Sequence, residues 1–118
     1  MSDESKEEVE EYPLLIQTQG RLRTLTLNRP HRMNALTPEL HHQLREAVFD
    51  AAEDSDVGAV LLTGAGRGFC AGGDIKASSD RARKTRETVE ERAESIRQHS
   101  KTTIALNQMP KITIALIN

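Results

Sequence analysis

A glycine-rich segment in the middle of the chain is where chemistry is most readily placed. Five of the ten residues from Gly64 to Gly73 are glycine, and the polar residue Asp74 follows. So many glycines cost backbone entropy, a cost that is offset where positive φ angles or a close approach of backbone to a ligand are needed. Backbone N–H groups free of regular structure can point at an anion or a developing oxyanion. The segment is therefore either a backbone donor site or a long surface turn.

Two phosphate-binding motifs can be tested against this segment. A P-loop matches the spacing of Gly68 and Gly73, but Asp74 and Ile75 stand where Lys and Ser or Thr are required. The dinucleotide fingerprint G-x-G-x-x-G/A is matched by residues 66–71, but two glycines follow where a helix should begin, and glycine weakens a helix. The P-loop fails, and a dinucleotide-binding dehydrogenase is kept as a minor hypothesis.

The cysteine and the histidines offer little independent chemistry. No base is placed beside Cys70 by the sequence, so it is predicted to be a small core residue. His41 and His42 are adjacent in an expected helix and point in different directions. Together with His31 and His99 they lack the spacing of metal ligands, and no metal site is predicted.

Composition limits the classes of function. The chain has 118 residues and a net charge of −2, so it carries no basic field to attract nucleic acid. A single cysteine excludes an internal disulfide and fits a reducing compartment. The acidic start is unlike a signal peptide, and no apolar run approaches the roughly 18 residues of a membrane span. A cytoplasmic protein that binds neither nucleic acid nor membrane is expected.

The elements before the glycine-rich segment start after an acidic tail. Residues 1–11 hold six acidic residues and one lysine, which predicts disorder, and residues 12–118 are expected to form one partial domain. Residues 14–19 and 21–28 predict two strands around a glycine, in a hairpin-like start. Thr37 and Pro38 then favour a helix to about residue 54. Its predicted core stripe is Leu40, Leu44, Ala47, Val48 and Ala51.

The remaining elements alternate strand and helix. Residues 57–63 form an almost wholly apolar run, typical of a strand buried on both faces. Residues 85–108 predict a helix, and residues 111–118 predict a second strand of the buried type. The order indicates an α/β fold with at least one parallel crossover. The stripe expected on the second helix comprises Val89, Ala93, Ile96, Thr103, Ile104 and Asn107.

Four segments, in order, resemble one family. Residues 69–76 (FCAGGDIK) look like the F-C-A-G-x-D-[IL] signature of the enoyl-CoA hydratase/isomerase, or crotonase, family. Residues 25–30 (LTLNRP) with 33–37 (MNALT) resemble its L-N-R-P…N-A-L segment. Residues 60–64 resemble the strand that enters the loop, and residues 111–118 resemble the strand that leads to the family's second glycine loop. The resemblance covers about residues 14–118.

The resemblance implies a crotonase-like (ClpP/crotonase) fold of repeated ββα units that binds acyl-CoA thioesters. Two backbone N–H groups would stabilise a thioester enolate, and the first would come from Gly73. No separate cofactor is implied, because coenzyme A is part of the substrate. Lys76 is a candidate partner for a CoA phosphate, with a solvated lysine as the alternative, and the same two interpretations apply to the basic cluster of residues 81–86. The implied substrate- and CoA-binding residues are Met33, Asn34, Ala35, Leu36, Ala71, Gly72, Gly73, Asp74, Ile75 and Lys76.

The family pattern extends past the end of this sequence. Its second oxyanion donor, its proton-transferring carboxylates and its C-terminal helices are expected after Asn118. The resemblance therefore implies a truncated N-terminal fragment, inactive alone, of a full-length homotrimer or dimer of trimers. A non-catalytic remnant or interaction module is the alternative. Leu25, Leu27 and the apolar residues of 60–62 and 112–117 are expected to lack the elements that normally cover them.

Overall fold

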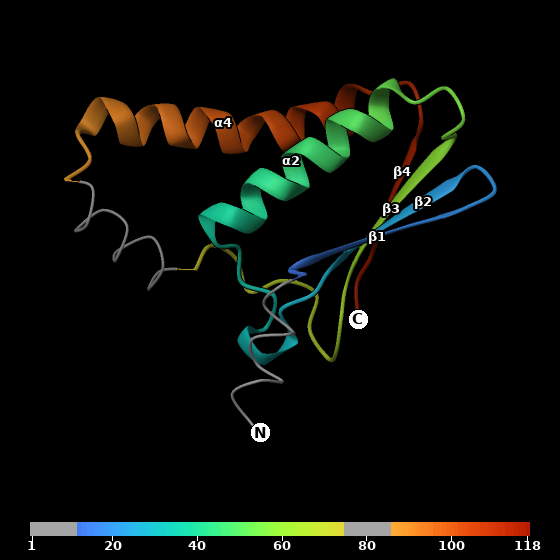
Figure 1. The fold of residues 1–118 in the computed structure, drawn as a ribbon, viewed down its shortest axis with the longest axis horizontal. Helices are drawn as coiled ribbons and strands as arrows, with labels where there is room; N and C mark the ends of the chain where they lie inside the picture. The colour runs from blue at the N-terminus through green and yellow to red at the C-terminus, as the bar shows by residue number, and fades with distance from the viewer. Residues whose placement is uncertain (1–11, 75–85) are drawn as a thin grey trace.

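The computed structural model describes residues 12–74 and 86–118, so the predicted acidic tail lies outside the described residues. The described elements follow the predicted order, with the first helix ending at Glu53 and the second beginning at Val89 (Figure 1). They are β1 (Leu14–Gln19), β2 (Leu22–Leu27), the 3-10 turn η1 (Pro30–Arg32), α2 (Pro38–Glu53), β3 (Ala59–Gly64), α4 (Val89–Gln108) and β4 (Ile112–Leu116).

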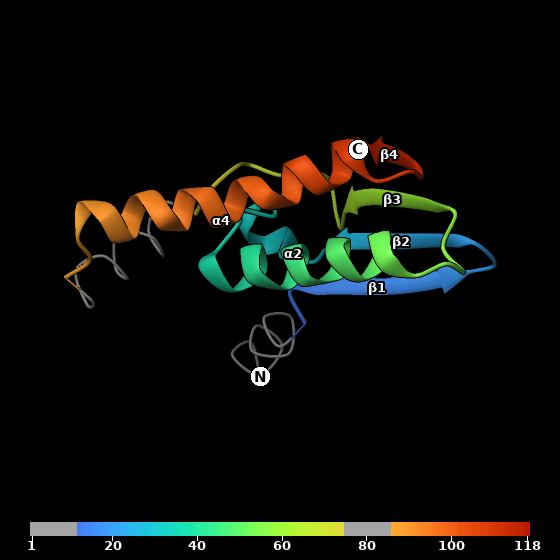
Figure 2. The ribbon, with the colours of Figure 1, turned by 90° about the horizontal axis from the view of Figure 1, so that it is seen from above.

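The four strands form one sheet in the order β1-β2-β3-β4. β1 and β2 pair antiparallel as a hairpin, whereas β2, β3 and β4 run parallel. Each parallel connection passes through a helix, and both helices lie on the same side of the sheet, with α2 against the strands and α4 packed chiefly against α2 (Figures 1 and 2). The parallel arrangement brings the carboxyl ends of β2, β3 and β4 to one edge, where the glycine-rich segment begins.

Helix α2 forms for the predicted reasons and buries the predicted stripe. The Thr37 side chain accepts a hydrogen bond from the Leu40 N–H at 3.1 Å, and Pro38 occupies the first turn. At its carboxyl end, Lys111 Nζ donates to the carbonyl oxygen of Ala51 at 2.6 Å and to that of Asp54. The buried residues of α2 are Leu40, Leu44, Ala47, Val48 and Ala51, the five that helical spacing predicts.

The sequence predicted that the apolar side chains of the strands would lack covering elements. This prediction was wrong for the central strands and right for the edge strand β4. Leu25, Leu27 and Val60 are 0%, 2% and 1% exposed, because α2 packs over the strands that carry them. In β4, Ile112 and Leu116 are 64% and 54% exposed. The predictions that β3 and β4 are buried on both faces were therefore wrong within the described residues, which cover only one face of the sheet.

The predicted core stripe of α4 was also wrong. Val89, Ile96 and Ile104 are exposed, and the side of the helix that contacts α2 and the core instead carries Thr102, with Ala105 and Leu106 partly buried. Both choices fit a helical period. The rotation of α4 follows from its tertiary partner, α2, which spacing within one helix does not specify.

Candidate functional site

Two chain segments meet at the carboxyl edge of the sheet, residues 29–36 and the glycine-rich segment 64–74. Asn34 joins them, and its side chain is fully buried. Its Oδ1 accepts from the Arg29 N–H at 2.8 Å, and its Nδ2 donates to the carbonyl oxygens of Ala65 at 2.9 Å and Gly68 at 2.8 Å. Asn34 has φ of 56°, directly after Met33 with φ of 53°. A left-handed pair of this kind is uncommon outside glycine.

The two segments also pair through their backbones. The N–H of Ala71 donates to the carbonyl oxygen of Met33 at 2.9 Å, and the N–H of Leu36 donates to that of Gly72 at 2.7 Å. The N–H of Asp74 in turn donates to the carbonyl oxygen of Leu36 at 2.8 Å. These bonds make Leu36 and Gly73 an isolated parallel bridge, which holds the end of the loop in a fixed register.

Gly73 presents its own N–H away from this bridge. In a parallel bridge the bonds use the groups before and after the bridged residue, here the Gly72 oxygen and the Asp74 N–H, so the N–H of Gly73 points to the other side. Within residues 12–74 and 86–118 that N–H has no hydrogen-bond partner. Gly73 is exposed, and a Cβ built on it would meet nothing within 4 Å. The residue is an exposed backbone donor whose N–H points away from the bridge.

Two other glycines explain why the loop has this composition. Gly72 has φ of 104°, a conformation that residues with a side chain rarely adopt. A Cβ on Gly64 would lie 2.3 Å from the carbonyl oxygen of Phe69 and 2.7 Å from that of Gly68. The glycines are therefore needed for a positive φ at one position and for close backbone packing at the other, and the loop is not an unstructured turn.

Arg29 is a buried residue that connects the two segments of the site. This arginine is 7% exposed, and its Nη1 donates to the carbonyl oxygen of Ala35 at 2.5 Å and lies 3.3 Å from Asp74 Oδ2. The sequence predicted Asp74 as a binding residue and did not predict this ion pair. Lys76 lies outside the described residues.

The structure brings most of the predicted site residues together. Met33, Ala35 and Leu36 lie beside residues 71–74, whereas the Asn34 side chain faces the interior. Ile75 and the basic residues Arg81, Arg83 and Lys84 lie outside the described residues. Cys70 is partly buried, packs against the core, and its Sγ accepts from the Gly72 N–H at 3.4 Å, as a structural residue would.

The end of β4 reaches the same loop. Asn118 Nδ2 donates to the carbonyl oxygens of Gly64 at 2.9 Å and Gly66 at 2.5 Å. Thr63 Oγ1 donates to the carbonyl oxygen of Leu116 at 2.9 Å. Sequence reasoning missed the contacts of Asn118, Asn34 and Arg29. The signal in the sequence was weak: Asn34 and Asn118 are polar residues next to apolar ones, and Arg29 precedes a proline.

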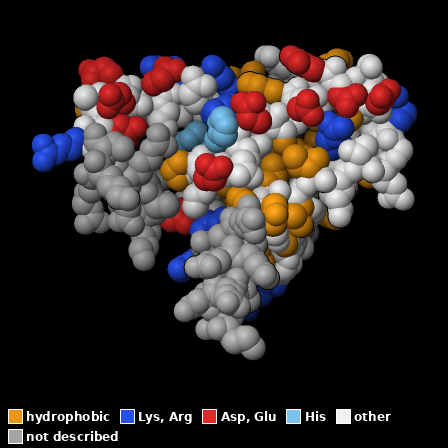
Figure 3. All heavy atoms as spheres, in the orientation of Figure 1, with side chains coloured by type: hydrophobic (Ala, Val, Ile, Leu, Met, Phe, Trp, Pro, Cys, Tyr) orange, Lys and Arg blue, Asp and Glu red, His pale blue; other side chains and the backbone are white. Residues whose placement is uncertain are grey.

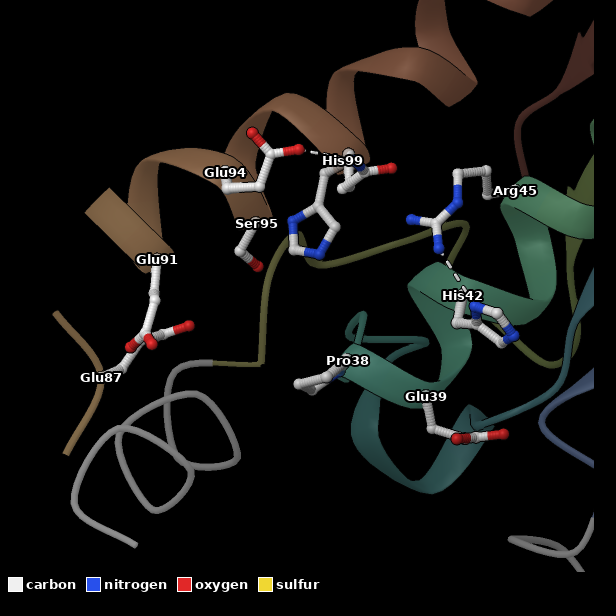
Figure 4. Close-up of a pocket in the computed structure, with 10 residues that line it drawn as sticks. Pro38, Glu39, His42, Arg45, Glu87, Glu91, Glu94, Ser95 and His99 are labelled. Atoms are coloured by element: carbon white, nitrogen blue, oxygen red, sulfur yellow. Dashed lines mark hydrogen bonds between the residues drawn. The ribbon is translucent and has the colours of Figure 1, made fainter. Parts of the chain in front are cut away.

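A separate open hollow of about 670 Å³ lies between α2 and α4 (Figure 4). At its margin the rings of His41 and His99 stack with centroids 3.7 Å apart. Burial, followed by the positive charges of His99 and Arg45, lowers the pKa of His41 from 6.5 to about 4. Carboxylates line the α4 side of the hollow, and acidic side chains are spread along the helical side of the molecule (Figure 3).

Neither a metal centre nor a membrane span is found in the described part of the chain. Residues 12–74 and 86–118 contain no group of three or more His, Cys, Asp or Glu side chains placed to hold a metal ion. None of the described helices is long and apolar enough to cross a membrane.

Comparisons with known proteins agree on one family. The enoyl-CoA hydratase/isomerase family model matches residues 22–118. The chain is 54% identical over 52 residues to 1,2-epoxyphenylacetyl-CoA isomerase of Escherichia coli, covering 44% of this chain and 20% of that protein. Two solved structures match 90% of this chain and 40% of their own. They are Pseudomonas aeruginosa AtuE, with a TM-score of 0.80 and 30% identity, and an enoyl-CoA hydratase from Bacillus anthracis, with 0.76 and 26%.

Proposed function

This chain belongs to the enoyl-CoA hydratase/isomerase family, and from that premise we propose that residues 33–36 and 71–74 form part of an acyl-CoA thioester site. The described residues have the mixed α/β crotonase fold, and they span about a fifth of the E. coli relative and 40% of the two solved neighbours. Within this site Gly73 supplies one backbone donor of an oxyanion hole.

The observation that carries the proposal is the direction of the Gly73 N–H. The bridge to Leu36 occupies the polar groups on either side of Gly73 and leaves this N–H facing outward. The fixed register matters because a donor that is already oriented needs no reorganisation when charge develops in front of it. A thioester oxygen within hydrogen-bond distance of Gly73 N would be polarised in the free substrate and stabilised further as an enolate oxygen.

The reactions that such a donor supports are those in which negative charge develops on the thioester oxygen. In hydration, a water molecule gives up a proton to a general base while its oxygen bonds to Cβ of the enoyl thioester, and the π electrons of the Cα–Cβ bond move toward the carbonyl. The carbonyl oxygen then carries the negative charge of an enolate, and a proton added at Cα restores the thioester. Isomerisation forms a dienolate when a proton is removed from carbon, and the negative charge again develops on the carbonyl oxygen. In both reactions the donor acts on the transition state more strongly than on the bound substrate.

The negative charge of Asp74 is compatible with a site that binds anions, because an arginine neutralises it. The carboxylate pairs with the buried Arg29 guanidinium, so it adds little repulsion toward an enolate or a CoA phosphate. The backbone around Met33 and Leu36 is proposed to cradle the CoA moiety, and Ile75 and Lys76 remain predicted contacts. We keep cytoplasmic location and a trimeric assembly as proposals for a longer chain.

The 118 residues alone are proposed to lack turnover. They present one identified donor, and the one described carboxylate next to it, Asp74, is engaged by Arg29. A longer chain is therefore needed for the test. We define the hybrid enzyme as residues 1–118 followed by the part of the B. anthracis enoyl-CoA hydratase that lies beyond the equivalent of β4.

The test compares two substitutions of Gly73 in the hybrid enzyme. Gly73→Ala keeps the N–H and meets open space, so the rate of crotonyl-CoA hydration should stay near that of the parent hybrid. Gly73→Pro removes the N–H, which typically lowers kcat by about 10²–10³-fold. Circular dichroism and CoA binding establish that the Pro variant is folded, and the 118-residue chain is the negative control. Equal turnover by the Pro and Ala variants would show that Gly73 is not the donor.

A further inference from the structure

The side chain of Asn34 cannot itself touch a bound thioester, because it is fully enclosed. Its three hydrogen bonds nevertheless link residue 29, five positions earlier, to residues 65 and 68, more than 30 positions later. A buried carboxamide with both N–H groups and its oxygen engaged holds its surroundings in one arrangement. The carboxamide therefore ties the start of the glycine-rich loop to the 29–36 segment.

Backbone hydrogen bonds connect the segment of Asn34 to Gly73. Two residues after Asn34, Leu36 receives and donates the backbone bonds that flank Gly73, and Met33 accepts from Ala71. A shift of residue 34 therefore moves both strands of the bridge on which the Gly73 N–H depends. Asn34 itself is held at positive φ, a costly conformation that persists where the surrounding structure imposes it.

We infer that Asn34 is a positioning residue that aims the Gly73 N–H at the thioester oxygen. The inference rests on the proposed function, since it assigns Asn34 a part in that same donor site. Asn34 acts on the substrate indirectly, because it orients the backbone of the glycine-rich loop. Arg29 donates to the Ala35 carbonyl oxygen and to the Asp74 carboxylate, and so also connects residue 35 to residue 74.

Substitutions can separate the carboxamide donors from the backbone conformation. Asn34→Asp keeps the size and the tolerance of positive φ but removes both donors, so a carboxylate faces the carbonyl oxygens of Ala65 and Gly68. Asn34→Gly accepts the positive φ without strain and removes every side-chain bond. Asn28 provides a matched control, because its half-buried side chain donates only to the Tyr12 carbonyl oxygen, at 3.0 Å, among the described contacts.

The kinetic test uses the hybrid enzyme with crotonyl-CoA. Asn34→Asp and Asn34→Gly should lower kcat by about 10²-fold, the cost of a small misplacement of a catalytic group, while KM changes much less. Asn28→Asp should stay within about threefold of the parent hybrid in both parameters. A purely structural role would lower the amount of folded enzyme and leave kcat per folded active site unchanged, which titration of CoA-binding sites reveals.

A second measurement needs no turnover. Amide hydrogen exchange in the 118-residue chain should be faster for Ala71 and Asp74 in Asn34→Asp than in Asn28→Asp. Equal exchange in the two variants, or no protection of these amides in the parent, would overturn the positioning role. If Gly73→Pro loses kcat and Asn34→Asp does not, the positioning role alone fails. If Gly73→Pro keeps its full kcat, the proposed donor fails.

Discussion

At the scale of single residues, Gly64 gives a prediction about packing that is independent of catalysis. An added Cβ would meet two carbonyl oxygens and the Asn34 Nδ2, all within 2.7 Å, so Gly64→Ala forces the loop to move. Such overpacking typically costs about 1–3 kcal/mol. The thermal midpoint of the hybrid enzyme should fall by several degrees.

Gly73→Ala is the matched control for that measurement, since its Cβ meets nothing within 4 Å. Its midpoint should remain within about 1 °C of the parent, because surface changes away from packed features are usually within ±0.5 kcal/mol. Equal midpoints for the two alanine variants would mean that the close packing around Gly64 is not present in solution.

The donor role of Gly73 stays a prediction, and it is one that concerns only the backbone. Gly73 could be named because the family resemblance assigns the donor to its position in the motif, and a backbone donor requires no particular side chain. The partners of Asn34 and Arg29 could not be named. A buried amide or guanidinium must be hydrogen-bonded, but its partners lie up to 45 positions away, and only the folded chain brings them near.

At the scale of elements, the contact between α2 and α4 predicts a dependence of stability on pH. The pKa of His41 is lowered from 6.5 to about 4 in the folded chain, chiefly by burial. As pH falls below 6.5, the unfolded chain takes up this proton first. The stabilisation is therefore complete above pH 6.5 and is lost progressively as pH falls toward 4.

The size of this effect is moderate because the ring is only partly enclosed. We expect His41 to contribute about 1–2 kcal/mol of the stability lost between those limits, after allowance for solvent screening. Urea unfolding at several pH values, with His41→Gln as the control, measures it. A variant with the same slope of stability against pH as the parent would contradict the assignment to His41.

Element prediction succeeded where the signals are local and failed where they are not. The cap at Thr37 and the spacing of the five buried residues specify α2 without reference to the rest of the fold. The rotation of α4 depends on which of two acceptable faces meets α2. The exposure of β4 depends on what lies beyond it, so an apolar strand pattern predicts the strand and not its burial.

At the scale of the whole molecule, the described chain is one sheet with helices on one face. The opposite face includes Leu61 and Ile114, which lie side by side in the register of β3 and β4. Family membership could be predicted because four short motifs stand in order along the chain, and each has its own structural reason. The choice between hydration and isomerisation needs groups that the described site does not contain.

The central claim is that the Gly73 N–H polarises a thioester carbonyl, and infrared spectroscopy tests it most directly. Crotonyl-CoA labelled with ¹³C at the thioester carbonyl would be bound to the hybrid enzyme and to its Gly73→Ala and Gly73→Pro variants. A hydrogen bond to the oxygen weakens the C=O bond and lowers its stretching frequency. A donor at Gly73 should give a lowered frequency in the parent and the Ala variant, and a frequency shifted back toward that of free substrate in the Pro variant. The same frequency in all three bound complexes would contradict it.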